Sequence, residues 1–155
     1  MSLKQRTRSH YRYFELHRLR WSDNDQYGHV NNSIYAFLID SIVNSYLISS
    51  CSLRPTDSSS PHIGLVVASK CQYFASLEFP EEVELGLAVR KMGRSSVEYE
   101  VGFFRKGRDE VSAVGGFTHV FVEREGRRPV KELREELKEG LGKVLVPLGE
   151  EKARL

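Results

Sequence analysis

The feature that most restricts the fold of this chain is a long apolar segment in its first third. From 34 to 48, Ile, Tyr, Phe, Leu and Val recur at helical spacing and spread around much of the helix circumference. A helix that is apolar over so wide an arc is normally buried on several sides. Asn31, Asn32 or Ser33 can cap it, because their side-chain oxygens accept from amides of the first turn. The chain must therefore supply a surface that wraps this helix.

Strand-like segments flank the apolar helix on both sides. An alternating segment at 13–21 precedes it, and four more segments follow without an intervening helix, at about 63–74, 82–91, 96–106 and 110–123. Short polar connections separate the last four segments, so we expect neighbours along the chain to pair antiparallel. The segment 129–145 is amphipathic and charged, and it predicts a final helix with Pro129 near its first turn.

These elements together predict an α+β fold. A five-stranded antiparallel sheet wrapped around the central helix would bury the helix on several sides. The length of 155 residues fits one domain. We expect that domain to span 1–155, with a core at about 12–125 and a C-terminal helical extension at about 129–145.

Composition and spacing argue against several classes of function. The net charge of +2, from 23 basic and 21 acidic residues, gives no general case for nucleic-acid binding. The chain shows no apolar run long enough to span a membrane, no metal-ligand spacing and no glycine-rich phosphate loop. We therefore expect no membrane span, no metal and no cofactor.

Cysteine usage and the N-terminus bear on location. Cys51 and Cys71 fit neither a metal motif nor a disulfide framework, which favours a reducing compartment. The N-terminus has no signal-peptide hydrophobic region. A cytoplasmic protein is the expectation, and the basic segment 1–14 leaves a mitochondrial location as the alternative.

The segment 21–32, WSDNDQYGHVNN, concentrates titratable and amide side chains before the central helix. Taken singly, each has a structural explanation: the two aspartates as turn formers, the asparagines as caps, the histidine as a packed residue. Their concentration at one helix entrance favours chemistry. A helix N-terminus offers unpaired amides to an oxyanion, and a carboxylate upstream can attack an acyl carbon or activate water. The segment therefore predicts an acyl-transfer or hydrolysis site.

The pattern W-S-D-x-D-x-x-G-H-V-N-N-x-x-Y at 21–35 resembles the signature of the 4-hydroxybenzoyl-CoA thioesterase-like branch of hot-dog proteins. It is also similar to the W-x-D-x-D-x-x-x-H-V-N-N-x-x-Y motif of plant acyl-ACP thioesterases. The order of elements extends the resemblance over about 12–125. The resemblance implies the hot-dog fold, in which a five-stranded antiparallel sheet wraps a long central helix.

The same resemblance implies roles for individual residues. Asp25 would be the catalytic carboxylate, as nucleophile or general base, and the backbone amide of Asn32 would polarise the thioester carbonyl. His29 matches the motif histidine of the acyl-ACP branch. That branch carries an Asn two residues after the aspartate, where this chain has Tyr27. Asp23 looks structural.

A second region, KMGRSS at 91–96, lies in the predicted turn between two strands. A basic turn with small hydroxyls could bind the phosphates of coenzyme A. The alternative is an exposed hairpin with solvated charges, and the two interpretations stand about even. The residues predicted to bind substrate are Tyr27, Gly28, Asn31, Arg94 and Ser95.

The leading functional hypothesis is hydrolysis of an acyl-CoA thioester to free acid and coenzyme A. The alternatives are an acyl-ACP thioesterase and a non-catalytic acyl-CoA-binding module. The resemblance also implies a homo-oligomer, a dimer or a dimer of dimers, because pairing would satisfy the open edge of the sheet. The turn around Arg94 would then serve the partner's Asp25.

Overall fold

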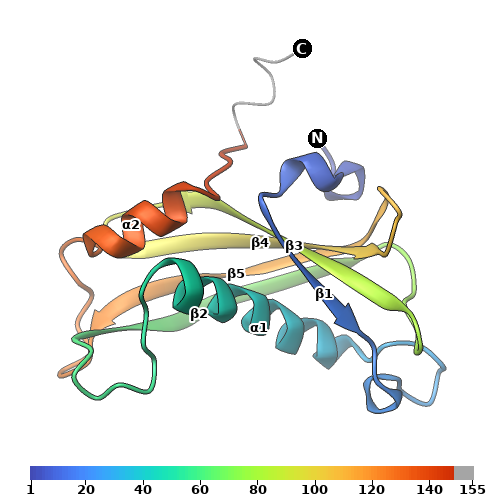
Figure 1. The fold of residues 1–155 in the computed structure, drawn as a ribbon, viewed down its shortest axis with the longest axis horizontal. Coiled ribbons are helices and arrows are strands. Elements are labelled where there is room, and N and C mark those ends of the chain that lie inside the picture. Colours follow the sequence, from blue (N-terminus) through green and yellow to red (C-terminus); the bar gives the residue numbers. More distant parts are fainter. Residues whose placement is uncertain (149–155) are drawn as a thin grey trace.

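The structure is a computed structural model that describes residues 1–148. Its five strands form one antiparallel sheet in the order β1-β3-β4-β5-β2, and α1 lies along one face of it (Figure 1). This arrangement confirms the predicted hot-dog fold. The elements are β1 (Tyr13–Arg18), α1 (Asn32–Ser50), β2 (His62–Tyr73), β3 (Glu82–Met92), β4 (Ser96–Arg105), β5 (Val111–Glu123) and α2 (Glu135–Gly142), with short 3₁₀ helices η1 (Leu3–Gln5), η2 (Arg8–His10) and η3 (Trp21–Asp23).

The central helix begins as its capping residues predict. Asn31 is the N-cap, and its Oδ1 accepts from the Ser33 backbone N–H at 3.0 Å. The face toward the sheet is buried, with Ile42 fully inaccessible. The helix is not buried on all sides within one chain, however, because Phe37 is 69% exposed. The wide apolar arc therefore exceeds what one sheet covers.

The strand pairing differs from the sequence expectation at one point. β3–β4 and β4–β5 pair as neighbours, but β2 pairs with β5 and not with β3. The segment 74–81 between β2 and β3 is no hairpin turn: Phe74 and Ala75 donate to the Ser112 carbonyl, and Leu77 accepts from Val30. The segment therefore connects β2 at one edge of the sheet to β3, which pairs with β1 at the other edge.

The final helix is also shorter than predicted. It begins at Glu135 and not near Pro129. Pro129 forms an isolated bridge with Val122, and the Val130 N–H donates to the Phe121 carbonyl at 3.0 Å. The chain thus first pairs with the C-terminal end of β5 and becomes helical only afterwards, since this pairing satisfies its backbone groups instead.

A buried ionic cluster fastens the N-terminal segment to the sheet face opposite α1 (Figure 1). The Glu100 carboxylate accepts from Arg6 at 3.0 Å, from Arg90 at 2.6 Å and from the Tyr11 hydroxyl at 2.8 Å. Burial alone would raise the pKa of Glu100, but the hydrogen bonds from Arg90 and Arg6 outweigh it and lower the pKa to about 2. Glu100 is therefore ionised and forms ion pairs with both Arg6 and Arg90.

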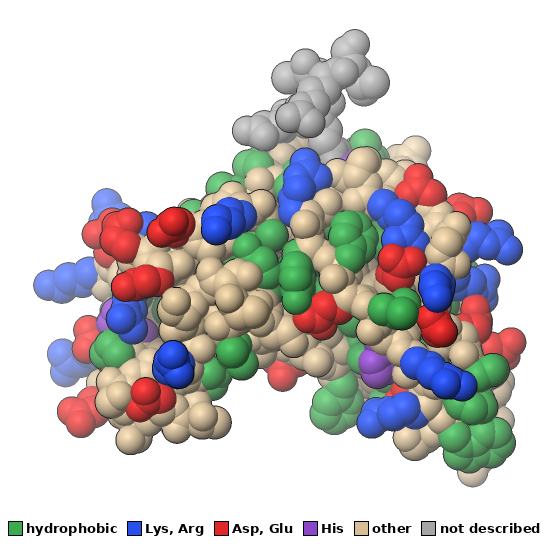
Figure 2. All heavy atoms as spheres, viewed as in Figure 1, with side chains coloured by type: hydrophobic (Ala, Val, Ile, Leu, Met, Phe, Trp, Pro, Cys, Tyr) green, Lys and Arg blue, Asp and Glu red, His purple; other side chains and the backbone are tan. Residues whose placement is uncertain are grey.

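Charges are otherwise mixed on the surface. On the face shown in Figure 2, acidic and basic side chains are interspersed and do not gather into a patch of one sign. Nucleic-acid binding normally requires a continuous basic stripe. This face offers none.

His119 on β5 makes the stability of the fold depend on pH. It is buried between the rings of Phe117 and Phe121, and the Tyr99 hydroxyl lies 3.2 Å from its Nδ1. Burial lowers its pKa from 6.5 to about 4, so the folded state holds it neutral where the unfolded chain binds a proton. Its contribution is complete above pH 6.5 and is lost as pH falls toward about 4.

We expect His119→Gln to flatten this dependence. Between about pH 7.5 and about pH 5 the parent should lose about 2 kcal/mol that the variant does not lose. Urea unfolding of both proteins at the two pH values measures the difference. Parallel losses in parent and variant would contradict this account.

Candidate active site

The loop before α1 folds back on itself and presents two functional side chains. The Asp25 N–H donates to the His29 carbonyl at 2.9 Å, and the Gly28 N–H donates to the Asp25 carbonyl at 3.2 Å. Gly28 has φ +85°, a conformation that L residues with side chains rarely adopt. The sequence D-Q-Y-G-H thus forms a tight turn that places Asp25 and His29 side by side.

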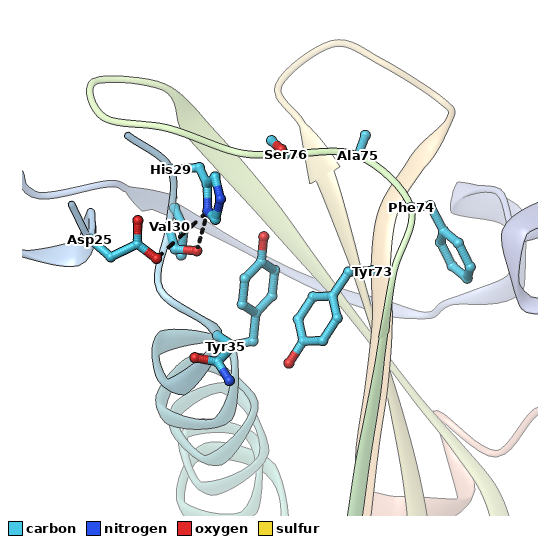
Figure 3. A pocket seen from close by; sticks show the side chains of 9 residues that line it. Asp25, His29, Val30, Tyr35, Tyr73, Phe74, Ala75 and Ser76 are labelled. Carbon is cyan, nitrogen blue, oxygen red and sulfur yellow. Dashed lines mark hydrogen bonds and ion pairs between the residues drawn. The ribbon is translucent and has the colours of Figure 1, made fainter. Parts of the chain in front are cut away.

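Both side chains face a cavity of about 400 Å³ (Figure 3). One wall comes from the loop and the start of α1, and the other comes from the end of β2 and the segment that follows it. Hydrogen bonds join the two segments that form these walls: the Val30 N–H donates to the Leu77 carbonyl at 2.7 Å, and the Phe79 N–H donates to Asn24 Oδ1 at 3.0 Å. The lining residues are Asp25, His29, Val30, Asn32, Tyr35, Tyr73, Phe74, Ala75 and Ser76.

One carboxylate oxygen of Asp25 accepts a hydrogen bond, and the other faces the imidazole of His29. Its Oδ1 accepts from the Tyr27 N–H at 2.8 Å, and its Oδ2 lies 3.8 Å from His29 Nδ1. Its side chain is 18% exposed. The turn-forming interpretation of this aspartate therefore holds, and the same residue also lines the cavity. A fixed carboxylate with a second, available oxygen is suited to attack or to proton abstraction.

The first residue of α1, Asn32, lines the same cavity as Asp25 and offers a backbone amide there. Ser33 and Ile34 donate to the Asn31 side chain and carbonyl, whereas the Asn32 N–H has no acceptor among residues 1–148. Free amides at a helix N-terminus carry the positive end of the helix dipole, so this one can stabilise a negatively charged oxygen.

Asp23 is the buried anchor of the loop. Its side chain is inaccessible, and it accepts from the Arg20 backbone N–H at 2.8 Å and from Arg20 Nη2 at 2.9 Å. Burial raises the pKa of Asp23, but the hydrogen bonds from Arg20 outweigh it and the net pKa is lowered. The Asp23 carbonyl accepts from the Asn31 N–H at 2.9 Å. This geometry agrees with the structural role expected for Asp23.

The other predicted substrate contacts do not line this cavity. Tyr27 is 88% exposed and stacks on His29, with ring planes 18° apart. Gly28 shapes the turn, and Asn31 is occupied as the N-cap. Exposed hydrophobic side chains gather at the lower right of Figure 2.

Arg94 and Ser95 lie at the opposite end of the sheet from Asp25. They sit in the turn between β3 and β4, where the Ser95 carbonyl accepts from the Phe121 N–H at 2.7 Å. The length of β3 separates them from the cavity, roughly 30 Å at strand rise. Within one chain the structure does not bring the basic turn to the cavity.

Two aromatic residues that line the cavity, Tyr35 and Tyr73, form its aromatic wall, and the sequence assigned them no role. Tyr35 is the last residue of the motif, and burial raises its pKa to about 12, so its phenol stays neutral. Its ring lies 4.9 Å from that of Tyr73 and 5.0 Å from that of Phe103. The motif position could have indicated Tyr35, but nothing in the local sequence singles out Tyr73, because the β2–β5 pairing brings it there.

Two further findings concern the described residues. Across 1–148, no group of three or more His, Cys, Asp or Glu side chains could hold a metal ion. No helix in this part of the chain is long and apolar enough to cross a membrane.

The fold and the site define a hot-dog protein with a carboxylate at the entrance of its central helix. A model of the thioesterase superfamily matches residues 27–112, more than half of the chain. The chain therefore belongs to the thioesterase superfamily, which confirms the resemblance and makes it a thioester hydrolase by class.

Solved structures agree with this assignment. A protein from Pseudomonas aeruginosa is 44% identical over 90% of this chain and 96% of its own, with a TM-score of 0.86. A 1,4-dihydroxy-2-naphthoyl-CoA thioesterase from Synechocystis shares the fold, with 14% identity over 84% of this chain and 95% of its own and a TM-score of 0.76. A gentisyl-coenzyme A thioesterase also shares it, with 20% identity over 83% of this chain and 99% of its own and a TM-score of 0.71. No curated protein matches the chain in sequence.

Proposed function

We propose that this protein hydrolyses an acyl-CoA thioester to a free carboxylic acid and coenzyme A in the cavity beside Asp25. The observation that carries the proposal is the pairing of two groups in one cavity: a carboxylate with an available oxygen and the unpaired Asn32 amide. Two proteins of the same fold are named for coenzyme A thioesters, which favours coenzyme A as the carrier.

The chemistry follows from this pairing. The thioester carbonyl would accept a hydrogen bond from the Asn32 N–H, which stabilises the oxyanion of the tetrahedral intermediate. Asp25 Oδ2 would either attack the carbonyl carbon, expelling the coenzyme A thiolate and leaving an anhydride for water to cleave, or take a proton from attacking water. His29, 3.8 Å from Oδ2, would orient the carboxylate.

The carrier is tested by presenting one acyl group in two forms. We expect a higher kcat/KM with the acyl group on coenzyme A than on acyl-carrier protein. The reverse order would make the protein an acyl-ACP thioesterase. Saturable binding of both without thiol release would make it a binding module.

We further propose that two copies pair through β2. This strand ends the sheet, and among residues 1–148 it pairs with β5 and with no second strand. Apolar side chains stay exposed along it and on the adjoining face of α1: Phe37 (69%), Val66 (50%), Val67 (60%) and Tyr73 (50%). Antiparallel pairing of two β2 strands would continue the sheet and cover these side chains. It would also bring the partner's Arg94 toward the Asp25 cavity, where it could bind coenzyme A phosphates.

Val67→Asp should break this pairing. A charge in the centre of the shared surface would be desolvated without a partner, so the variant should elute at the mass of one 17.8 kDa chain where the parent elutes at twice that mass. Light scattering after gel filtration measures both. Leu16→Asp is the matched control, because Leu16 is 56% exposed on β1 at the other edge. A monomeric parent would refute the proposed pairing.

We also propose a cytoplasmic location. Cys51 and Cys71 are both free thiols. Burial raises the pKa of both, which keeps them protonated and unreactive. Unpaired thiols suit a reducing compartment.

A further inference from the structure

His17 on β1 faces the buried anchor of the active-site loop. Its Nε2 lies 3.6 Å from Asp23 Oδ2, within ion-pair reach but too long for a hydrogen bond. Nε2 is itself buried and has no hydrogen-bond partner among the described residues, although the side chain as a whole is 28% exposed. A buried ring nitrogen without a partner costs free energy, which a carboxylate so near would relieve after a small movement.

The contacts of the Asp23 carboxylate come from two different parts of the chain. Arg20 supplies the hydrogen bonds to the Asp23 carboxylate, but Arg20 belongs to the same loop and its side chain is 66% exposed. Those bonds lie within the segment that follows β1 and involve no strand residue. His17 is the contact that comes from a strand: it pairs with Val83 of β3, which is fully buried. Among residues 1–148, His17 alone joins this carboxylate to the sheet.

The path from Asp23 to the reacting groups is short. The Asp23 carbonyl accepts from the N–H of Asn31, and the next residue carries the unpaired amide of the site. Asp25 follows Asp23 by two residues. Other bonds also hold the segment between β1 and α1. They join Phe79 to Asn24, Val30 to Leu77 and Leu19 to Glu81, and all lead to the connection between β2 and β3.

We infer that His17 is a positioning residue: by holding the Asp23 carboxylate against the sheet, it sets where Asp25 and the Asn32 amide meet the substrate carbonyl. The inference rests on the proposed function. A shift of the loop by about 1 Å would misalign the attacking oxygen and the oxyanion donor, which costs about 10²-fold in rate. Substrate binding would change little, since under the proposed function it would depend on Tyr35, Tyr73 and the residues that contact coenzyme A.

The test compares three variants under steady-state conditions. His17→Ala should lower kcat by roughly 10- to 100-fold while KM stays within about twofold. His17→Gln should recover most of the loss, because its amide can still donate toward Asp23. Tyr13→Phe is the control: Tyr13 lies four positions before His17 on the same face of β1, and its hydroxyl donates to Glu15 and not to Asp23. It should keep the parental kcat.

Hydrogen exchange gives a readout that does not depend on turnover. The Asn31 amide, bonded to the Asp23 carbonyl, should exchange faster in His17→Ala and at the parental rate in His17→Gln. The inference is overturned if His17→Ala keeps the parental kcat and Asn31 exchange. It is equally overturned if both His17 variants lose activity only in proportion to unfolded protein. If the parent hydrolyses no thioester, the proposed function fails, and Asn31 exchange still decides whether His17 places the loop.

Discussion

Asp25→Asn should lower kcat/KM for acyl-CoA hydrolysis by roughly 10³-fold and leave the fold intact. The variant keeps an Oδ1 that can accept from the Tyr27 N–H, so the turn that shapes the loop is preserved. It loses the negative charge that attack on a carbonyl or proton abstraction from water requires. Initial rates of thiol release measure the effect, and circular dichroism checks the fold.

Asp57→Asn is a closely matched control. The Asp57 Oδ1 also accepts from the N–H two residues on, at 2.9 Å from Ser59. Asp57 lies in the loop between α1 and β2 and does not line the cavity. The Asp57→Asn variant should hydrolyse acyl-CoA at the parental rate. Parental activity in Asp25→Asn would rule out a catalytic role for this carboxylate.

The largest effect on stability is expected for Glu100→Gln. This change leaves the buried guanidinium groups of Arg6 and Arg90 facing a neutral amide, which costs about 3–5 kcal/mol because their charges stay desolvated. Urea unfolding at neutral pH measures the loss. An equal stability of parent and variant would show that the cluster does not fasten the N-terminal segment.

Two comparisons sharpen this test. Glu84→Gln removes a carboxylate that Arg8 also contacts twice, but the pair is about a quarter exposed and should cost less than about 1 kcal/mol. In the parent, the contribution of Glu100 is complete above its ordinary pKa of 4.5 and is lost as pH falls toward about 2. The Glu100→Gln variant should lack this part of the acid dependence.

Local patterns in the sequence predicted the elements well. The helix spacing after Asn31 and the alternation in the strands depend on neighbours a few residues apart, so the central helix and the strands appear within a few residues of their expected places. The active-site turn is equally local, since Gly28 and Asp25 determine it together. Asp25, His29 and Asn32 therefore meet in one cavity as their spacing suggested, and their roles stay predictions.

What depends on long-range pairing could not be predicted. The segment 74–81 has the composition of a turn, but β2 pairs with β5 and not with β3, so the segment does not close a hairpin. The same ladder brings Tyr73 to the cavity. Pro129 suits a first helical turn, but it pairs with Val122 at the C-terminal end of β5 instead. Contacts within a single chain do not explain the exposed Phe37. We propose that a second copy of the chain covers it.

The most direct test of the proposed function is thiol release by the parent protein from a panel of short, long and aromatic acyl-CoAs. We expect at least one of them to be hydrolysed with a kcat/KM of about 10⁴ M⁻¹s⁻¹ or more, the usual range for an enzyme on its own substrate. Saturable binding without thiol release from any member of the panel would contradict the proposal and leave a binding module.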